Sequence, residues 1–125
     1  MPHFVIQQHE TDQGIHWDLM LEDGQRLATW QVPVHPGDWL GGPIFCKQLP
    51  NHRPIYLTYE GQISNNRGWV HIICRGDYQK IDVQDRKWIV NLKSTPPGQN
   101  DKYLAISGQL LLELTEDDNW RLVLT

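Results

Sequence analysis

The sequence predicts an all-β protein, a small antiparallel β-barrel of about eight strands with one long loop rich in proline and glycine. Short segments with apolar residues at alternate positions recur along the 125 residues, and turn-forming residues separate them. No segment keeps an apolar stripe at the period of a helix, so long helices are not expected. A single domain, residues 1–125, is expected, and its six tryptophans suit a small core of large side chains.

Three strands are predicted in the first quarter of the chain. Residues 4–9 form a short run that begins with three apolar side chains, residues 15–22 alternate between apolar and polar side chains, and the polar segment between them suits the turn of an antiparallel hairpin. Asp23 and Gly24 form the kind of tight turn that hairpins favour. Residues 26–32 are therefore expected to form the third strand.

The middle of the chain has a different character. Residues 33–54 contain five prolines and three glycines. Proline removes backbone hydrogen-bond donors and glycine loosens the chain, so a long ordered loop is expected here, with room for one helical turn or short strand. Residues 55–59 are expected to form a strand that ends at Glu60 and Gly61, and residues 63–67 are expected to form a turn.

Strands are predicted again in the second half of the chain. Residues 69–74 and 78–83 are expected to pair around a turn at residues 75–77, and residues 87–92 are expected to form a further strand.

The end of the chain alternates once more between polar and apolar stretches. Residues 94–102 predict an exposed polar loop. Residues 103–114 predict one bent strand or two, divided at Gly108, and residues 120–124 predict the last strand.

Charge excludes one class of function. The chain has 11 Lys and Arg against 15 Asp and Glu, a net charge of −4, without a long block of either sign. A protein that coats nucleic acid non-specifically needs a basic face, so this class is excluded. A small basic pocket that binds one phosphate end remains open.

No segment predicts export or membrane insertion. The first residues lack the basic and apolar regions of a signal peptide, and no apolar run approaches the ~18 residues that span a bilayer. Cys46 and Cys74 form no CxxC motif; a single disulfide between them is open but not indicated, and two reduced thiols are the simpler expectation. These observations predict a cytoplasmic protein that does not associate with a membrane.

Two histidines and an aspartate form a candidate metal site. Side chains alternate between the two faces of a strand, so His16, Asp18 and Met20 share one face of the second strand with Glu22. The other face is apolar and is expected to pack in the core: Ile15, Trp17, Leu19 and Leu21. A hairpin would return His9 close to His16. Two imidazoles and a carboxylate that meet at one point suit a divalent metal ion.

Several short motifs follow one another in a fixed order. They are FVIQQH at 4–9, HWDLMLEDG at 16–24, WQVP at 30–33, HRPIY at 52–56, YEG at 59–61 and Arg-Gly at 75–76. Together they resemble the 3′-phosphoesterase domain of bacterial DNA ligase D, which also exists as short standalone proteins. The resemblance covers most of the chain.

The resemblance implies a small β-barrel hydrolase of DNA repair that removes a 3′-phosphate or a 3′-ribonucleotide from nucleic-acid ends. It implies that His9, His16 and Asp18 hold a divalent metal, first of all Mn²⁺. His52 and Tyr56 would be the catalytic residues that contact the scissile phosphate. The donor set also suits Zn²⁺ or another transition metal. The implied partners are a nucleic-acid 3′ end and a separate DNA ligase or polymerase.

The chain departs from the family pattern at the phosphate-binding positions. Met20 stands where members linked to the ligase have an arginine that binds phosphate, and Val34 replaces a lysine. A methionine cannot form the charge-assisted hydrogen bonds of an arginine. Arg53 and Arg75 are the candidates for substrate binding in its place, with Arg67 as a further choice.

Two other functions compete with the hydrolase. A non-catalytic barrel that binds a nucleic-acid end or a partner protein is favoured by Met20. An iron oxygenase with a facial triad would use His16 and Asp18 with His71 as the third ligand. The two enzyme hypotheses differ in their third ligand, His9 or His71.

Overall fold

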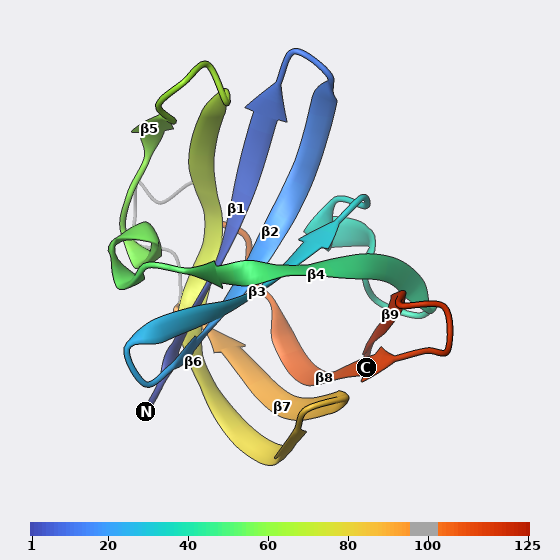
Figure 1. Cartoon of the computed structure of the whole chain (residues 1–125). Helices are drawn as coiled ribbons and strands as arrows, with labels where there is room; N and C mark the ends of the chain where they lie inside the picture. Colours follow the sequence, from blue (N-terminus) through green and yellow to red (C-terminus); the bar gives the residue numbers. More distant parts are fainter. Residues whose placement is uncertain (96–102) are drawn as a thin grey trace.

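The computed structural model describes residues 1–95 and 103–125. It confirms the predicted all-β class, because nine strands form one antiparallel sheet (Figure 1). Eight of these strands close into a ring, since β1 pairs with both β2 and β6. The fold is therefore barrel-like. Within the described ranges, no helix is long and apolar enough to cross a membrane.

The ring follows the order β1-β2-β3-β4-β9-β8-β7-β6 and then returns to β1. β5 pairs only with β6 and lies outside the ring. The strands are β1 (His3–Thr11), β2 (Gly14–Asp23), β3 (Arg26–Val32), β4 (Ile44–His52), β5 (Gly61–Gln62), β6 (Trp69–Gln84), β7 (Lys87–Ser94), β8 (Ser107–Leu114) and β9 (Trp120–Leu124). Two short 3-10 helices precede and follow β4: η1 (Pro36–Asp38) and η2 (Pro54–Leu57).

The first three strands and the last form where the sequence predicts them. β1 and β2 extend one or two residues beyond the predicted strands, and β3 and β9 have the predicted bounds. β7 also forms as predicted, with two additional residues at its end. β7 and β9 alternate regularly between more and less buried side chains, whereas β1, β2 and β3 each contain four consecutive buried residues.

The prediction of a loop across residues 33–54 is wrong for its second half. β4 runs from Ile44 to His52 and pairs with β3 on one side and β9 on the other. Its register with β3 shifts between Leu27 and Thr29, which lie opposite His52 and Leu49. Pro50 therefore lies in the irregular part of the pairing, where a missing N–H is tolerated.

The predicted strand at residues 55–59 is a 3-10 helix instead. η2 begins at Pro54, whose ring presets the backbone φ for a helical turn. The backbone N–H of Tyr56 donates to the carbonyl of Arg53, and that of Thr58 donates to the carbonyl of Ile55.

The predicted hairpin around residues 75–77 is also wrong, because β6 runs without interruption from Trp69 to Gln84. Gly76 is not a turn residue; it lies between Phe4 of β1 and Ser94 of β7. A Cβ atom at Gly76 would lie 2.2 Å from the carbonyl oxygen of Lys93. Glycine is required here because neighbouring backbones approach closely, not because the chain reverses.

The last two predictions have a mixed outcome. Ser94 ends β7, and residues 96–102 of the predicted polar loop lie outside the described residues. Of the one or two strands predicted at 103–114, a single strand forms from Ser107. Gly108 lies within it at a φ of +145° and does not divide it.

The ring encloses the main core, which contains buried side chains from all eight of its strands. A second, smaller cluster lies on the outer face of the ring. It consists of Val5, Met20, Leu27 and Ile72, with Tyr56 and Leu57 of η2 and Tyr103 packed against it. β1 and β2 therefore bury side chains on both faces.

The predicted apolar face of β2 is only partly in the core. Leu19 and Leu21 are fully buried in the main core, and Trp17 packs at its edge. Ile15 is 50% exposed, because the end of the β1–β2 hairpin extends beyond β4 (Figure 1). Met20 was expected on a polar face but is fully buried in the outer cluster.

Candidate metal centre

The β1–β2 hairpin brings the predicted metal ligands together. His9 lies directly opposite His16 in the register of the two strands, and Gln7 lies opposite Asp18. Cross-strand partners point to the same face, so all four side chains lie on the outer face of the ring. The predicted convergence of His9 and His16 is confirmed.

The potential ligand atoms lie close to one another. His9 Nδ1 is 3.1 Å from His16 Nε2 and 3.8 Å from Asp18 Oδ2. His16 Nε2 is 3.3 Å from Asp18 Oδ1. Two ligand atoms at about 2.1 Å from one ion lie about 3.0–3.4 Å apart at tetrahedral or octahedral angles. Two of the three separations lie in this range, and the third, 3.8 Å from His9 Nδ1 to Asp18 Oδ2, exceeds it by about 0.4 Å, so a single divalent ion requires a small closing of the His9–Asp18 pair.

A hydrogen bond orients His9 for this role. His9 Nε2 is 2.6 Å from the carbonyl oxygen of Arg67, which can only accept, so Nε2–H is the donor. Nδ1 then carries the lone pair and faces His16. Metal-binding histidines typically donate their second ring N–H to a carbonyl or carboxylate in this way. At 3.1 Å the two facing nitrogens need a proton or a cation between them.

Asp18 provides the test of whether a cation fits here. Its side chain is only 4% exposed, and its Oδ1 atom accepts no hydrogen bond from the described residues, although His16 Nε2 lies 3.3 Å away. Leaving a buried carboxylate oxygen unpaired is costly, and a metal ion is one of the few groups that can satisfy it. The donor set and this oxygen both fit a divalent metal.

Gln7 connects η2 to the metal cluster, that is, the group of His9, His16 and Asp18. Its Nε2 donates to the carbonyls of Tyr56 at 2.8 Å and Tyr59 at 2.9 Å, while its buried Oε1 has no described partner. Gln7 was not among the residues predicted from the sequence. Gln7 is two positions before His9 on β1, so strand alternation could have placed it on the same face.

The predicted catalytic pair lies beside the metal cluster. His52 at the end of β4 and Tyr56 in η2 line one cavity of about 90 Å³ with His9 and Asp18. The rings of His52 and Tyr56 meet edge to face, with centroids 5.6 Å apart. The other lining residues are Gln7, Met20, Ile63, Arg67 and Val70. His52, Tyr56 and the metal cluster can therefore act on one small group.

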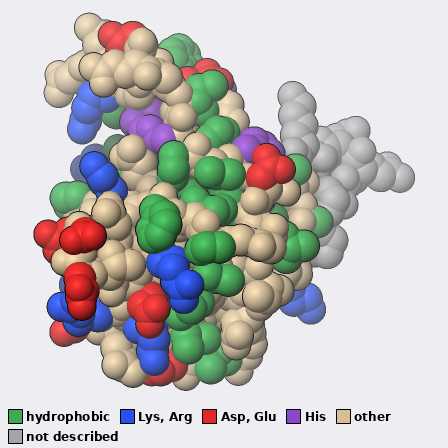
Figure 2. Space-filling model, turned by 90° about the vertical axis from the view of Figure 1, so that its right-hand side faces the viewer, with side chains coloured by type: hydrophobic (Ala, Val, Ile, Leu, Met, Phe, Trp, Pro, Cys, Tyr) green, Lys and Arg blue, Asp and Glu red, His purple; other side chains and the backbone are tan. Residues whose placement is uncertain are grey.

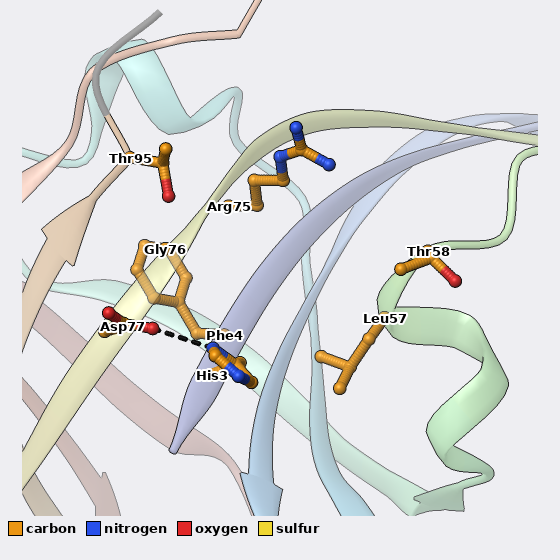
Figure 3. A pocket seen from close by; sticks show the side chains of 8 residues that line it. All are labelled: His3, Phe4, Leu57, Thr58, Arg75, Gly76, Asp77 and Thr95. Carbon is orange, nitrogen blue, oxygen red and sulfur yellow. Dashed lines mark hydrogen bonds and ion pairs between the residues drawn. The ribbon is translucent and has the colours of Figure 1, made fainter. Parts of the chain in front are cut away.

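The two predicted substrate-binding arginines lie elsewhere. Arg53 lines a neighbouring cavity that shares Tyr56 and Ile63 with the first. Arg75 lines a separate cavity of about 280 Å³ between β1, β6 and the end of η2 (Figure 3). There its guanidinium carbon lies 4.7 Å from the ring centroid of Tyr103. Of the three arginines considered, only Arg67 lines the cavity of the metal cluster.

His71, the third ligand of the alternative iron site, points away from the cluster. It lies opposite Gln8 on β1, whereas His9 lies opposite Val70, so His71 faces the other side of the sheet. Its Nε2 is 3.9 Å from Glu10 Oε2. The structure does not assemble His16, Asp18 and His71 into a facial triad.

The wider surface is mixed in charge. On the face shown in Figure 2, Lys and Arg side chains lie beside Asp and Glu side chains, with hydrophobic side chains between them. Histidine side chains lie in the upper part of this face. On this face, attraction for a phosphate therefore has to come from a local group of residues.

The fold and the cluster define a barrel-like all-β protein with a candidate metal centre on its outer wall. Compared with known proteins, the chain matches no protein-family model and no curated sequence at a significant level. A function is therefore inferred from the geometry of His9, His16 and Asp18 and from the motifs that contain them.

Proposed function

We propose that this protein is a metal-dependent phosphoesterase that removes a 3′-phosphate or a 3′-ribonucleotide from nucleic-acid ends in DNA repair. The observation that carries the proposal is the buried Asp18 carboxylate, one oxygen of which accepts no hydrogen bond from the described residues. It lies beside two imidazole nitrogens and lines the same cavity as His52 and Tyr56. Hydrolysis of a phosphate ester by this mechanism needs a metal site and groups that bind the phosphate, and one small cavity would provide both.

The three metal ligands would hold Mn²⁺ first, with Zn²⁺ or another transition metal as alternatives. When bound, such an ion polarises a phosphoryl oxygen and lowers the pKa of a bound water. His9 and His16 present nitrogen lone pairs, and Asp18 supplies the negative charge that favours a divalent cation.

The two aromatic residues would act on the phosphate. His52 Nδ1 is 3.0 Å from the carbonyl oxygen of Pro50, so Nδ1–H donates there and Nε2 remains for the substrate. Nε2, when protonated, can donate to a phosphoryl oxygen or to the leaving oxygen. The Tyr56 hydroxyl is a second donor on the same cavity, and Gln7 holds its backbone in place.

The family motifs support the same assignment. The resemblance to the 3′-phosphoesterase domain of DNA ligase D selects residues from three motifs, at 4–9, 16–24 and 52–56. These residues line this cavity or lie beside it: His9, Asp18, His52 and Tyr56 line it, and His16 lies beside them. The partners in this proposal are a nucleic-acid 3′ end and a separate DNA ligase or polymerase.

An end-processing assay tests the proposal. Primer–templates that end in a 3′-phosphate or a single ribonucleotide are incubated with the protein and Mn²⁺ or Zn²⁺. We expect product with the wild type and with Asp117→Ala, an exposed control, and none with Asp18→Ala. Equal product from the wild type and Asp18→Ala would show that the assigned metal site is not responsible.

One observation favours the non-catalytic alternative. Met20 stands where the family has an arginine, and it is fully buried in the outer cluster. Because a methionine side chain is uncharged, this position contributes no charge to the cavity. A barrel that binds ends without cleaving them would show tight binding of a 3′-phosphate end and no product with any metal.

A further inference from the structure

A loop of residues 63–68 lies beside the cluster of His9, His16 and Asp18. It connects β5 to β6, and the backbone N–H of Ile63 donates to the carbonyl of Gly68 at 2.8 Å. Asn65 and Asn66 adopt left-handed φ values of 63° and 56°, which asparagine tolerates better than most residues. A Cβ atom at Gly68 would lie 1.9 Å from the carbonyl oxygen of Glu10, so the loop is packed directly on β1.

Arg67 connects this loop to the cluster in two ways. Its backbone carbonyl accepts the hydrogen bond from His9 Nε2. Its side chain lines the cavity with Asp18, His52 and Tyr56. Arg67 Nε donates to the carbonyl of Ser64 at 3.0 Å, which orients the guanidinium within the loop.

The positive charge of the Arg67 guanidinium is not neutralised by a nearby carboxylate among the described residues. It forms no ion pair with a carboxylate in the described part of the chain. An arginine that is held in place without an acidic partner is suited to bind an anion, because its planar fork matches phosphate oxygens. Neither Arg53 nor Arg75 lines this cavity.

The size of the cavity limits what this charge can meet. Its volume of about 90 Å³ is well below the roughly 300–1,000 Å³ of pockets that enclose whole small molecules. A single tetrahedral oxyanion fits the cavity, whereas a nucleoside has to remain outside it.

We propose that Arg67 binds the terminal phosphate and provides the cation that Met20 does not. The preferred substrate is then a 3′-phosphomonoester end, whose phosphate enters the cavity between Arg67, His52, Tyr56 and the metal cluster. This inference rests on the proposed function, and it names the substrate group and the residue that recognises it. Because the Arg67 carbonyl also orients His9, one residue aligns the metal ligand and the phosphate.

Binding experiments separate the side chain of Arg67 from its backbone. The full chain, loaded with Mn²⁺, is titrated with oligonucleotides that end in 3′-phosphate, 3′-hydroxyl or 5′-phosphate, and with inorganic phosphate. Mn²⁺ affinity is measured in parallel by calorimetry. The variants are Arg67→Ala, Arg67→Lys and the control Arg121→Ala, whose native partner is Glu113 on the surface.

We expect Arg67→Ala to weaken binding of the 3′-phosphate end by about 10- to 100-fold, because a charge-assisted hydrogen bond is lost. Binding of the 3′-hydroxyl end and of Mn²⁺ should change less than about threefold, since the backbone carbonyl remains. Arg67→Lys should fall between the wild type and Arg67→Ala, because it keeps the charge without the fork. Arg121→Ala should resemble the wild type.

Several outcomes would overturn the inference, and they differ from failure of the proposed function. Unchanged 3′-phosphate affinity in Arg67→Ala overturns it, even if the wild type cleaves ends. A parallel loss of Mn²⁺ affinity assigns Arg67 a structural role instead. A wild type that shows no preference for the 3′-phosphate end also overturns it. Loss of 3′-phosphate binding in Arg67→Ala supports it even if the wild type gives no product, a result that would reject only the hydrolase.

Discussion

The two faces of the β1–β2 pair belong to the same strands but differ in composition and in what packs against them. Along Phe4, Ile6, Leu19 and Leu21 the inner face is apolar and belongs to a core that all eight strands of the ring share, and polar residues follow on it only toward the end of the hairpin. The outer face changes along its length: Val5 and Met20 pack in the small outer cluster, while beside it Gln7 and Asp18 are buried and His9 is half-buried. Only η2 and a few neighbouring residues pack on the outer face, so polar atoms there are buried and still line a cavity. The closed interior of the ring offers no such arrangement in the described residues.

The largest effect should follow from a change to the inner face. Leu19→Ala removes a fully buried side chain from the main core, where the surroundings collapse only partly into the space. We expect it to lower the free energy of unfolding by about 2–5 kcal/mol, measured by urea denaturation. Mn²⁺ affinity of the folded fraction should be nearly unchanged, because Leu19 points away from the cluster. A large loss of metal affinity would contradict the separation of the two faces.

The neighbouring residue should behave in the opposite manner. Asp18→Asn removes a buried charge that has no complete set of partners, so stability without metal should change by less than about 1 kcal/mol. The wild type should gain about 2.7 kcal/mol when Mn²⁺ is present at about 100 times its Kd, and this gain should vanish in the variant. Thermal unfolding with and without Mn²⁺ measures both quantities, with the exposed Asp117→Asn as the control. Metal stabilisation that survives in Asp18→Asn would remove Asp18 from the site.

A third change should affect the outer face through its supporting loop. Gly68 has a φ of +94° and no room for a Cβ atom beside Glu10, so Gly68→Ala has to displace the loop that carries Arg67. We expect a loss of about 1–3 kcal/mol in stability and about 10- to 100-fold in Mn²⁺ affinity, because His9 loses its orienting carbonyl.

Gly24→Ala is the matched control for this prediction. Gly24 also has a positive φ, of +65°, but nothing lies within 4 Å of its Cβ position. It should show the backbone strain without the loss of metal affinity. If both variants bind Mn²⁺ as the wild type does, the link from Arg67 to His9 is not important.

Features that depend on neighbouring positions in one hairpin could be predicted from the sequence. The pairing of His9 with His16 follows from a short turn, and the common face of His16 and Asp18 follows from strand alternation. Leu19 and Leu21 were placed in the core by the same rule. In each case, the relevant information lies within about twenty residues of chain.

Features that depend on distant partners could not be predicted in this way. Residues 44–52 look irregular by composition, but β3 and β9 flank them on both sides and draw them into the ring. Gly76 resembles a turn residue, but the close approach of β7 explains it. Arg67 reaches the cavity because its loop packs on β1, a contact between residues far apart in sequence. The convergence of His9, His16 and Asp18 was therefore predictable, whereas only the fold shows which of the three arginines lines their cavity.

The smallest expected effect concerns two thiols. Cys46 and Cys74 are free and buried in the main core, and burial raises the pKa of each to about 12 from an ordinary value of 9.0. Because the pKa values are raised in the folded state, these thiols contribute stability that is complete below about pH 9 and is lost between about pH 9 and 12. At pH 8 a thiol reagent should therefore label neither cysteine in the native protein and both in denaturant. Rapid native labelling would show that the interior of the ring opens, and the contrast between a closed inner face and an accessible outer face would fail.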